Sequence, residues 1–294
     1  MRRTLILLVL LACLAGLAGL VLTRPGTVAP EAIAGLTGDA TRGEIIFHAG
    51  GCASCHMAPD TEDKRVLAGG LEIASPFGTF LVPNISSDTD HGIGSWSDLD
   101  LVNAVMKGTS PEGQHYYPAF PYTSYARGSL QDTVDLAAYL RTLPADPTPS
   151  QPHRIGFPFN IRASLGGWKL LFFRDGWVTP EDFAATDELT LGRSLVEGWG
   201  HCGECHTPRN ALGGPDFDQW LAGGPNPSGD GTIPNIRPAA LRWSANDIAA
   251  YLATGFTPDF DSAGGEMTDV IRNMAELPDG HLEAIAAYLT TLPE

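Results

Sequence analysis

The placement of cysteine constrains this chain more than any other feature of its sequence. Four of its five cysteines fall in two copies of one pattern, C-x-x-C-H, which reads "CASCH" at residues 52–56 and "CGECH" at residues 202–206. This pattern is the attachment motif of c-type haem, in which two thiols bond to the haem and the adjacent imidazole binds the iron. The motifs predict two covalently bound haem c groups, attached at Cys52, Cys55, Cys202 and Cys205 and ligated by His56 and His206.

Three other roles for these cysteines fit the sequence less well. A redox-active dithiol of the thioredoxin type requires a βαβ setting, which the sequence does not predict. A zinc site with four ligands would have to join two motifs that lie 150 positions apart (202 − 52). Structural disulfides are the third alternative. The repeated motif in an exported chain favours haem over all three.

The two motifs belong to a longer internal repeat. In each copy, a glycine and an apolar run precede the motif, and "LAGG", "PNI" and a Trp-Ser segment follow it. Each copy then closes on an "AAYL" segment and a proline. We therefore expect two haem domains in tandem, at residues 39–144 and 186–294.

Helix signals recur in both copies. Ser97 and Ser244 each stand three residues before an aspartate, which is the spacing of a capping box, and Gly108 and Gly255 stand at C-cap positions. No run of alternating apolar and polar residues is long enough to predict a sheet. The predicted fold class is all-α, with two cytochrome c-like domains after an N-terminal transmembrane helix.

The segment 145–185 is expected to connect the two domains. It follows Pro144 into "ADPTPSQP", a proline-rich and fairly stiff linker. The stretch "IRASLGGWKLLFF" at residues 161–173 is predicted to form a helix that braces one domain against the other. Contact with a membrane is the alternative role for this helix.

Residues 1–24 are predicted to anchor the chain in a membrane, followed by a linker at 25–38. Residues 4–23 form an uncharged stretch that is long enough to cross a bilayer, and two arginines precede it. Because positive residues stay on the cytoplasmic side, we expect the haem domains in the periplasm, at a bacterial inner membrane. A cleaved signal peptide is the alternative, although Pro30 directly follows the suitable site and disfavours cleavage. A lipoprotein site at Cys13 would leave an apolar stretch in the mature chain.

A haem iron held by histidine has a sixth coordination position, which methionine commonly fills in cytochromes c. In small c-type domains this methionine comes from the loop before the last helix. Met267, in "DSAGGEMTD", occupies that place in the second copy. Met274 is the alternative, but it stands nearer the final helix and suits core packing.

The equivalent position in the first copy holds Phe120. The Trp-Ser segments begin at Trp96 and Trp243, 147 positions apart, and the same offset carries Met267 onto Phe120. Phenylalanine cannot bind iron, so the first haem lacks its ligand at this place.

Two explanations of this substitution remain open. A neighbouring side chain replaces the ligand: His115 is the best candidate, and His91 or Met106 are weaker ones. Alternatively the first iron is five-coordinate, and is either shielded by Phe120 or open to a small molecule.

The formal charge of −16 and the pI near 4.7 disfavour nucleic acid and anionic membrane surfaces as partners. An acidic surface can steer a basic protein partner toward the chain, or it can simply maintain solubility.

Several stretches together resemble a known family. "AGGLEIASPFGTFLVPNISSDTDHGIGSWSDLDL", "YPAFPYTSY" and "GHCGECHTPRNALGG" are similar to the cytochrome c subunits of membrane-bound bacterial alcohol and gluconate dehydrogenases. The resemblance runs from about Asp39 to the C-terminus. It implies the haem sites at both motifs, Met267 as a distal ligand, and a place for Arg209 of "HTPRN" beside the second haem, paired with a propionate.

The sequence departs from this family in three respects. Those subunits typically carry a third haem, their first-domain loop usually reads "YPAMPY", and the anchor here is an N-terminal span. The family takes electrons from a periplasmic dehydrogenase and passes them to ubiquinone or the respiratory chain.

The sequence therefore predicts an electron relay between a redox protein partner and a downstream acceptor. The partner classes are a dehydrogenase subunit, a quinol-oxidising complex or a terminal oxidase. No catalytic acid–base pair, nucleophile or phosphate loop is present in the sequence. The alternative is a haem enzyme, peroxidase-like or acting on a small molecule at an open first haem. A redox or gas sensor is a third reading.

Overall fold

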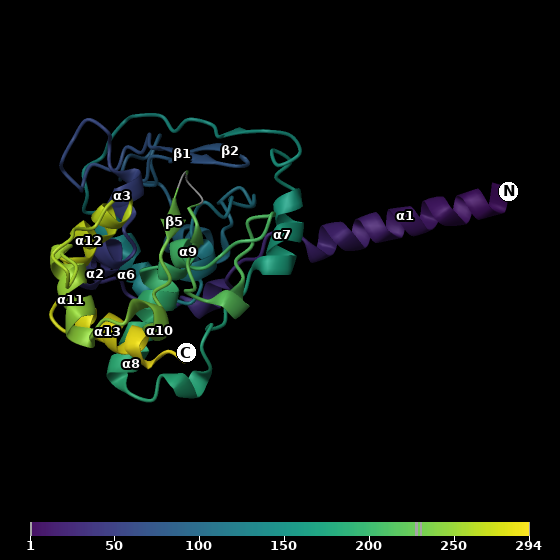
Figure 1. Ribbon diagram of the computed structural model, residues 1–294. Helices are drawn as coiled ribbons and strands as arrows, with labels where there is room; N and C mark the ends of the chain where they lie inside the picture. Colours follow the sequence, from purple (N-terminus) through teal and green to yellow (C-terminus); the bar gives the residue numbers. More distant parts are fainter. Residues whose placement is uncertain (1, 227–228, 230, 294) are drawn as a thin grey trace.

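The computed structural model describes residues 2–226, 229 and 231–293, and shows one folded body from which a single long helix projects (Figure 1). That helix, α1 (Arg2–Leu22), has no buried residue among those whose side chains the structure describes. It is long and apolar enough to span a bilayer, as an N-terminal signal sequence also is. Met1 and Glu294, the outer ends of the expected anchor and second domain, lie outside the described residues.

The first copy of the repeat is built mainly from short helices. After the 3₁₀ turn η1 (Pro30–Ala32) come α2 (Ala40–Ala49), α3 (Cys52–His56), β1 (Glu72–Ser75), β2 (Gly78–Leu81), α4 (Asp98–Lys107), α5 (Tyr122–Tyr125) and α6 (Leu130–Leu140). The connection to the second copy holds β3 (Arg154–Ile155), α7 (Ser164–Phe172) and η2 (Glu181–Phe183).

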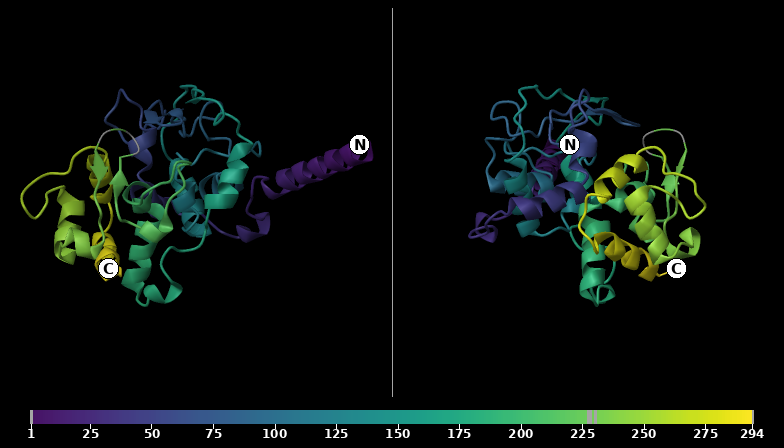
Figure 2. Two further views of the ribbon diagram at one scale, coloured as in Figure 1. Left: turned by 45° about the vertical axis from the view of Figure 1, so that its right-hand side comes forward. Right: turned by 90° about the vertical axis from the view of Figure 1, so that its left-hand side faces the viewer.

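The second copy follows a similar order, but its first helix ends in a π-helix and two further short helical elements are added. It contains α8 (Asp187–Arg193), the π-helix η3 (Ser194–Trp199), α9 (Cys202–His206), η4 (Phe217–Gln219), β4 (Gly224–Pro225), β5 (Thr232–Ile233), α10 (Pro238–Leu241), α11 (Ala245–Thr254), α12 (Met267–Met274) and α13 (His281–Thr291). The two halves lie side by side in both further views (Figure 2).

The all-α prediction needs a correction, because the structure contains two small antiparallel sheets. One has the order β1-β2-β3, and the other pairs β4 with β5. The strands are only two to four residues long, too short to show an alternating pattern, and β3 pairs with β2 across more than 70 residues of chain. Sequence periodicity could not reveal such pairing.

The predicted helix caps are confirmed. Ser97 and Ser244 each accept a hydrogen bond from the backbone of the aspartate three residues later, and each aspartate bonds back to the cap. Gly108 and Gly255 adopt the left-handed conformation at the C-caps. These caps fix the ends of α4 and α11 at corresponding places in the two copies.

In each copy the first and last helices cross at a glycine. A Cβ on Gly43 would lie 2.0 Å from the carbonyl oxygen of Asp135, and one on Gly192 would lie 2.1 Å from that of Ala284. Only glycine permits so close an approach of two backbones. Both crossings obey one offset, since 192 − 43 and 284 − 135 each equal 149.

The π-helix absorbs one extra residue in the second copy. From the crossing glycine to the first cysteine, the first copy spans 9 positions (52 − 43) and the second spans 10 (202 − 192). Gly50 N–H accordingly donates to the carbonyl four residues back, whereas Gly200 N–H donates to Leu195, five residues back. Both helices therefore reach their haem motif in the same way.

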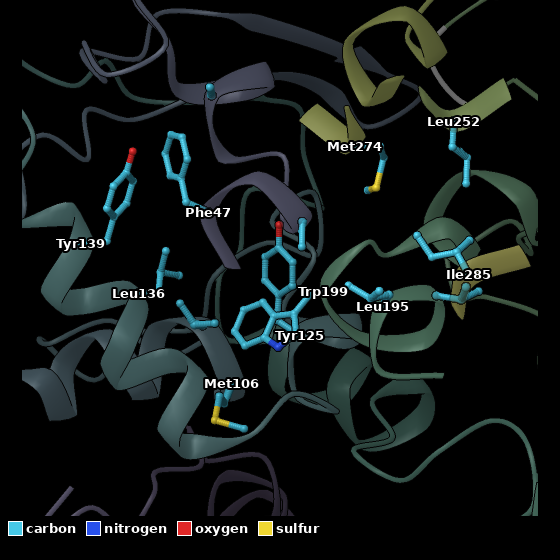
Figure 3. Close-up of a cluster of buried hydrophobic side chains, with 14 of the residues drawn as sticks. Phe47, Met106, Tyr125, Leu136, Tyr139, Leu195, Trp199, Leu252, Met274 and Ile285 are labelled. Atoms are coloured by element: carbon cyan, nitrogen blue, oxygen red, sulfur yellow. The ribbon is translucent and has the colours of Figure 1, made fainter. Parts of the chain in front are cut away.

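The main hydrophobic core runs through both copies. Tyr125 and Trp199 lie at its centre, with Phe47 and Leu136 on one side and Leu195 on the other (Figure 3). The rings of Tyr125 and Trp199 are 5.4 Å apart between centroids. The two repeats are thus joined by core packing as well as by the linker.

Candidate haem sites and the contact between them

Each motif occupies a five-residue helix that presents its cysteines and histidine on one side. In α3, Cys52 and Cys55 are three residues apart and His56 is four residues after Cys52, so the three lie on one helix face. None of the five cysteines is joined to another in a disulfide. Burial raises the pKa of Cys52, and that of Cys202, to about 12. Thiols held protonated in this way do not suit a reactive dithiol.

Both motif histidines are oriented by a proline carbonyl. The Nδ1 atom of His56 lies 2.8 Å from Pro83 O, and that of His206 lies 2.8 Å from Pro234 O. A carbonyl can only accept, so Nδ1 carries the proton in each ring and Nε2 keeps its lone pair for a metal. Burial lowers the pKa of His56 to about 4, which keeps this imidazole neutral. The residues present therefore fit a covalently held haem in both copies.

The "PNI" repeat is thereby explained. Its prolines, Pro83 and Pro234, supply the carbonyl that orients each motif histidine. The sequence shows the repeated tripeptide. It does not show the role of the tripeptide, because a backbone carbonyl accepts a hydrogen bond whatever the side chain is.

The loop predicted to carry the sixth ligand is closed by a corresponding backbone bridge in both copies. Thr109 pairs with His115 in the first copy, and Phe256 pairs with Ser262 in the second, each in an isolated antiparallel bridge. Both pairs obey the offset of 147. Met267, partly buried at the start of α12, and Phe120 thus follow equivalent loops.

Phe120 stands in an aromatic surrounding. Its ring lies 6.0 Å from Tyr116, 6.3 Å from Tyr122 and 5.9 Å from Tyr125, all in edge-to-face arrangements. Burial raises the pKa of Tyr116 to about 12, so its hydroxyl stays protonated at neutral pH. This position of the first copy is therefore lined by carbon and neutral hydroxyl groups.

His115 has a partner of its own in the structure. Its Nε2 lies 2.9 Å from Thr23 O, so Nε2 donates to the residue that follows α1. Its Nδ1 is buried and has no hydrogen-bond partner among the described residues. Ligation of the first iron by His115 would therefore use Nδ1, and it stays a prediction.

Of the weaker ligand candidates, His91 is exposed on the surface, whereas Met106 and Met274 are buried in the hydrophobic core.

Arg209 lies against the second motif, where its partners are protein groups. Its guanidinium donates to the carboxylate and the backbone carbonyl of Glu204, and to Gly213 O at 2.8 Å. A haem propionate that paired with Arg209, as predicted, would have to share its guanidinium with Glu204 and Gly213.

Glu204, between the two cysteines of "CGECH", is a functional candidate that the sequence did not single out. Its carboxylate accepts hydrogen bonds from Thr123 and Ser124 of the first copy, each at 2.6 Å. Burial alone would raise the pKa of Glu204, but Arg209 and these two hydroxyls outweigh it and leave that pKa below its ordinary value. The second haem motif is thus tied directly to the first domain.

The two motif segments also meet at one carbonyl. Gly50 O, two residues before Cys52, accepts a 2.8 Å hydrogen bond from Tyr125 Oη and lies 3.3 Å from His201 Nε2. On the same side, Asn273 of α12 donates to Ser54 of α3 at 2.6 Å. The fold therefore places the two attachment sites next to each other.

Comparison with known proteins agrees with this geometry. The family model of cytochrome c matches residues 40–144. A "Diheme cytochrome c-type" protein from Cereibacter sphaeroides is 60% identical over 276 residues, which cover 93% of each chain. The "Fructose dehydrogenase cytochrome subunit" of Gluconobacter japonicus is 38% identical, over 86% of this chain and 52% of its own length.

A further relative is the cytochrome c subunit of "Alcohol dehydrogenase (quinone)" from Gluconacetobacter polyoxogenes. It is 36% identical over 86% of this chain and 55% of its own length. The chain spans about half the length of both dehydrogenase subunits. These relatives are electron-transfer cytochromes, and we conclude that the chain belongs to the cytochrome c family, as a homologue of a diheme cytochrome c and of the cytochrome c subunits of bacterial dehydrogenases.

Proposed function

We propose that this chain is a membrane-tethered periplasmic cytochrome that carries two covalently bound haem c groups and relays electrons between a redox partner and a downstream respiratory acceptor. One observation carries the proposal: the segments of both haem motifs meet at Gly50 O, through Tyr125 and His201. Bound haem supplies one-electron chemistry. The chain fixes its place and ligation and keeps the two sites close together.

The proposed residues of the two sites follow the repeat. Cys52 and Cys55, like Cys202 and Cys205, would hold the haem through thioether bonds. His56 and His206 would bind iron through Nε2, because the Nδ1 atom of each lies on a proline carbonyl. Met267 would supply the second ligand of the iron at the second site.

The names of the relatives support a dehydrogenase as the electron donor. Fructose, alcohol and gluconate dehydrogenases each have a cytochrome subunit similar to this chain. A quinol-oxidising complex is the alternative donor, and a terminal oxidase is a suitable acceptor. The net charge of −16 favours partners with a basic docking surface.

The location in the periplasm rests on α1. A helix of 21 residues is about 31 Å long, which matches the hydrocarbon thickness of a bilayer. Arg2 and Arg3 at its start orient it with the N-terminus in the cytoplasm. The folded body then lies on the periplasmic side.

Transfer within the molecule is tested by photoreduction of the purified full-length protein. We expect the electron to redistribute between two spectrally distinct haems at a rate that does not change with protein concentration. A redistribution rate that is proportional to protein concentration would show exchange between molecules and contradict the relay.

Phe120 favours a second candidate function, a haem enzyme with an open first site. Carbon monoxide added to the reduced protein distinguishes the two functions. Rapid binding at half of the haem content would indicate an open or weakly covered first iron, whereas no binding would support two six-coordinate sites. The matched variant is Phe120→Met, which restores the side chain of the second copy. It should abolish any carbon monoxide binding at the first site.

A further inference from the structure

The chain that leaves α1 is fixed on the folded body. Thr23 O receives the His115 Nε2–H bond at 2.9 Å, Gly26 O accepts from the Thr109 hydroxyl at 2.8 Å, and Val28 N–H donates to Asn103 at 2.7 Å. The end of α1 therefore has a defined position on the body. If α1 spans a bilayer, the membrane surface must pass close to these residues.

The helix α7 lies directly against this exit point (Figure 1). A Cβ on Gly166 would lie 2.1 Å from Thr23 O, so α7 touches the backbone at the end of α1. The inner side of α7 is occupied: Leu165 packs on Phe80 and Tyr117, and Lys169 Nζ donates to the carbonyls that end α4. Helix α7 is thus held rigidly where the anchor meets the body.

Apolar side chains gather around this helix without being buried. Phe157 is 81% exposed, Ile161 49%, Leu170 62% and Leu171 65%, and Phe159 is also exposed. Outside α1, the described residues include nine exposed large hydrophobic side chains, and these five fall within residues 157–171. We call them the α7 patch. An exposed apolar cluster of this kind marks an interaction site rather than ordinary surface.

The residues bordering the α7 patch suit a lipid interface. Arg24 is exposed at the exit of α1, and Arg162 lies over the ring of Tyr117, at 5.2 Å from its centroid. Trp168 of α7 is partly exposed and donates through its indole nitrogen to Leu212 O. Arginine and tryptophan are the residue types that flank apolar segments at membrane surfaces.

We propose that the α7 patch inserts into the outer face of the same bilayer that α1 spans, and so fixes the tilt of the haem-bearing body on the membrane. The proposal rests on α1 being an uncleaved anchor. Because the whole chain carries a charge of −16, apolar insertion rather than attraction to anionic lipid drives the contact. Zwitterionic lipid should therefore suffice.

The test uses the full-length holoprotein in nanodiscs of phosphatidylcholine that contains a photoactivatable diazirine lipid. After illumination, mass spectrometry maps the lipid adducts along the chain. We expect adducts on α1 and on residues 157–171. The loop that carries Phe256 and Phe260, which are 62% and 93% exposed, should remain at background. This loop is the matched control, because it is apolar and exposed but lies on another part of the body.

A pair of double variants sharpens the test. Phe157→Gln with Leu171→Gln should reduce adducts on residues 157–171 to background and leave those on α1 unchanged. Phe256→Gln with Phe260→Gln should change neither. Haem content and absorption spectrum check that each variant is folded.

Two outcomes would overturn the proposal, and they are distinguishable. Adducts on α1 with only background on residues 157–171 would leave the anchor intact and remove the α7 patch from the membrane. Adducts on neither segment would show that α1 itself is not in the bilayer, which also contradicts the membrane tether in the proposed function. Electron redistribution between the haems is measured separately and does not depend on either result.

Discussion

The hydrogen bonds and the ion pair of Glu204 join the two domains, and from them we predict how much this side chain contributes to the free energy of unfolding. Its side chain is only 15% exposed, and its carboxylate accepts two 2.6 Å hydrogen bonds from Thr123 and Ser124 and pairs with Arg209. A hydrogen bond to a charged group contributes about 1.5–3 kcal/mol, and removing one partner of a buried pair costs about 3–5 kcal/mol. Glu204→Ala should therefore lower the free energy of unfolding by about 3–5 kcal/mol.

The assay is guanidinium unfolding of the holoprotein, followed by far-ultraviolet circular dichroism and by haem absorbance. Haem content is measured first, because Glu204 lies between two attachment cysteines. Glu72→Ala is the control: Glu72 pairs with Arg154 on the surface, where the two side chains are 55% and 59% exposed. An exposed pair of this kind contributes no more than about 1 kcal/mol.

A double-mutant cycle between Glu204→Ala and Ser124→Ala isolates the contact between the domains. We expect a coupling free energy of about 1–3 kcal/mol, since the two groups share one hydrogen bond. If the two effects simply add, or if Glu204→Ala costs no more than Glu72→Ala, the reasoning is refuted.

Two further predictions concern stability. Gly43→Ala should lower the free energy of unfolding by about 1–3 kcal/mol in thermal or denaturant unfolding, because its new methyl would meet the Asp135 carbonyl. Gly167→Ala in α7 is the control: its new methyl has no atom within 4 Å, so the variant should be more stable by up to about 1 kcal/mol. Equal effects of the two substitutions would contradict the argument that the helices cross at Gly43. Burial by itself would raise the pKa of Asp135, but hydrogen bonds from Arg42 and neighbouring donors hold that pKa below its usual range. The contribution of the Asp135 carboxylate to the free energy of unfolding is therefore complete above its pKa in the unfolded chain, about 3.9. It is lost as the pH falls through the lower pKa of the folded protein. Asp135→Asn should cost about 1–3 kcal/mol at pH 7 and should flatten this acid-side loss, which unfolding curves from pH 7 to pH 3 will show or exclude.

Local signals carried much of the fold prediction. The capping boxes at Ser97 and Ser244 and the C-cap glycines lie within one helix each, so their spacing alone predicts them. The helix expected at residues 161–173 is present as α7, Ser164–Phe172. The strand β3 escaped prediction because Arg154 and Thr79 meet only after the chain has folded, and the other strands are too short to show an alternating pattern.

The contacts between the two motifs could not be predicted from the sequence either, because they join residues that are far apart in the chain. Ser124 and Glu204 are 80 positions apart, and Glu204 occupies a variable position of its motif. His115 stays a predicted ligand of the first iron, and the contact of its Nε2 with Thr23 O, 92 positions away in the chain, could not be read from the sequence. The change of offset from 149 at the crossing glycines to 150 at the cysteines was a readable signal of the π-helix.

The extra residue in that π-helix limits how far the two halves can be exchanged. One residue added to an ordinary α-helix would turn all that follows by about 100°. A chimera that replaced residues 192–201 with residues 43–51 would be one residue short and would remove Trp199, which is fully buried between the copies. The two halves of this chain share one pattern of helices, but a segment of one half cannot replace the corresponding segment of the other.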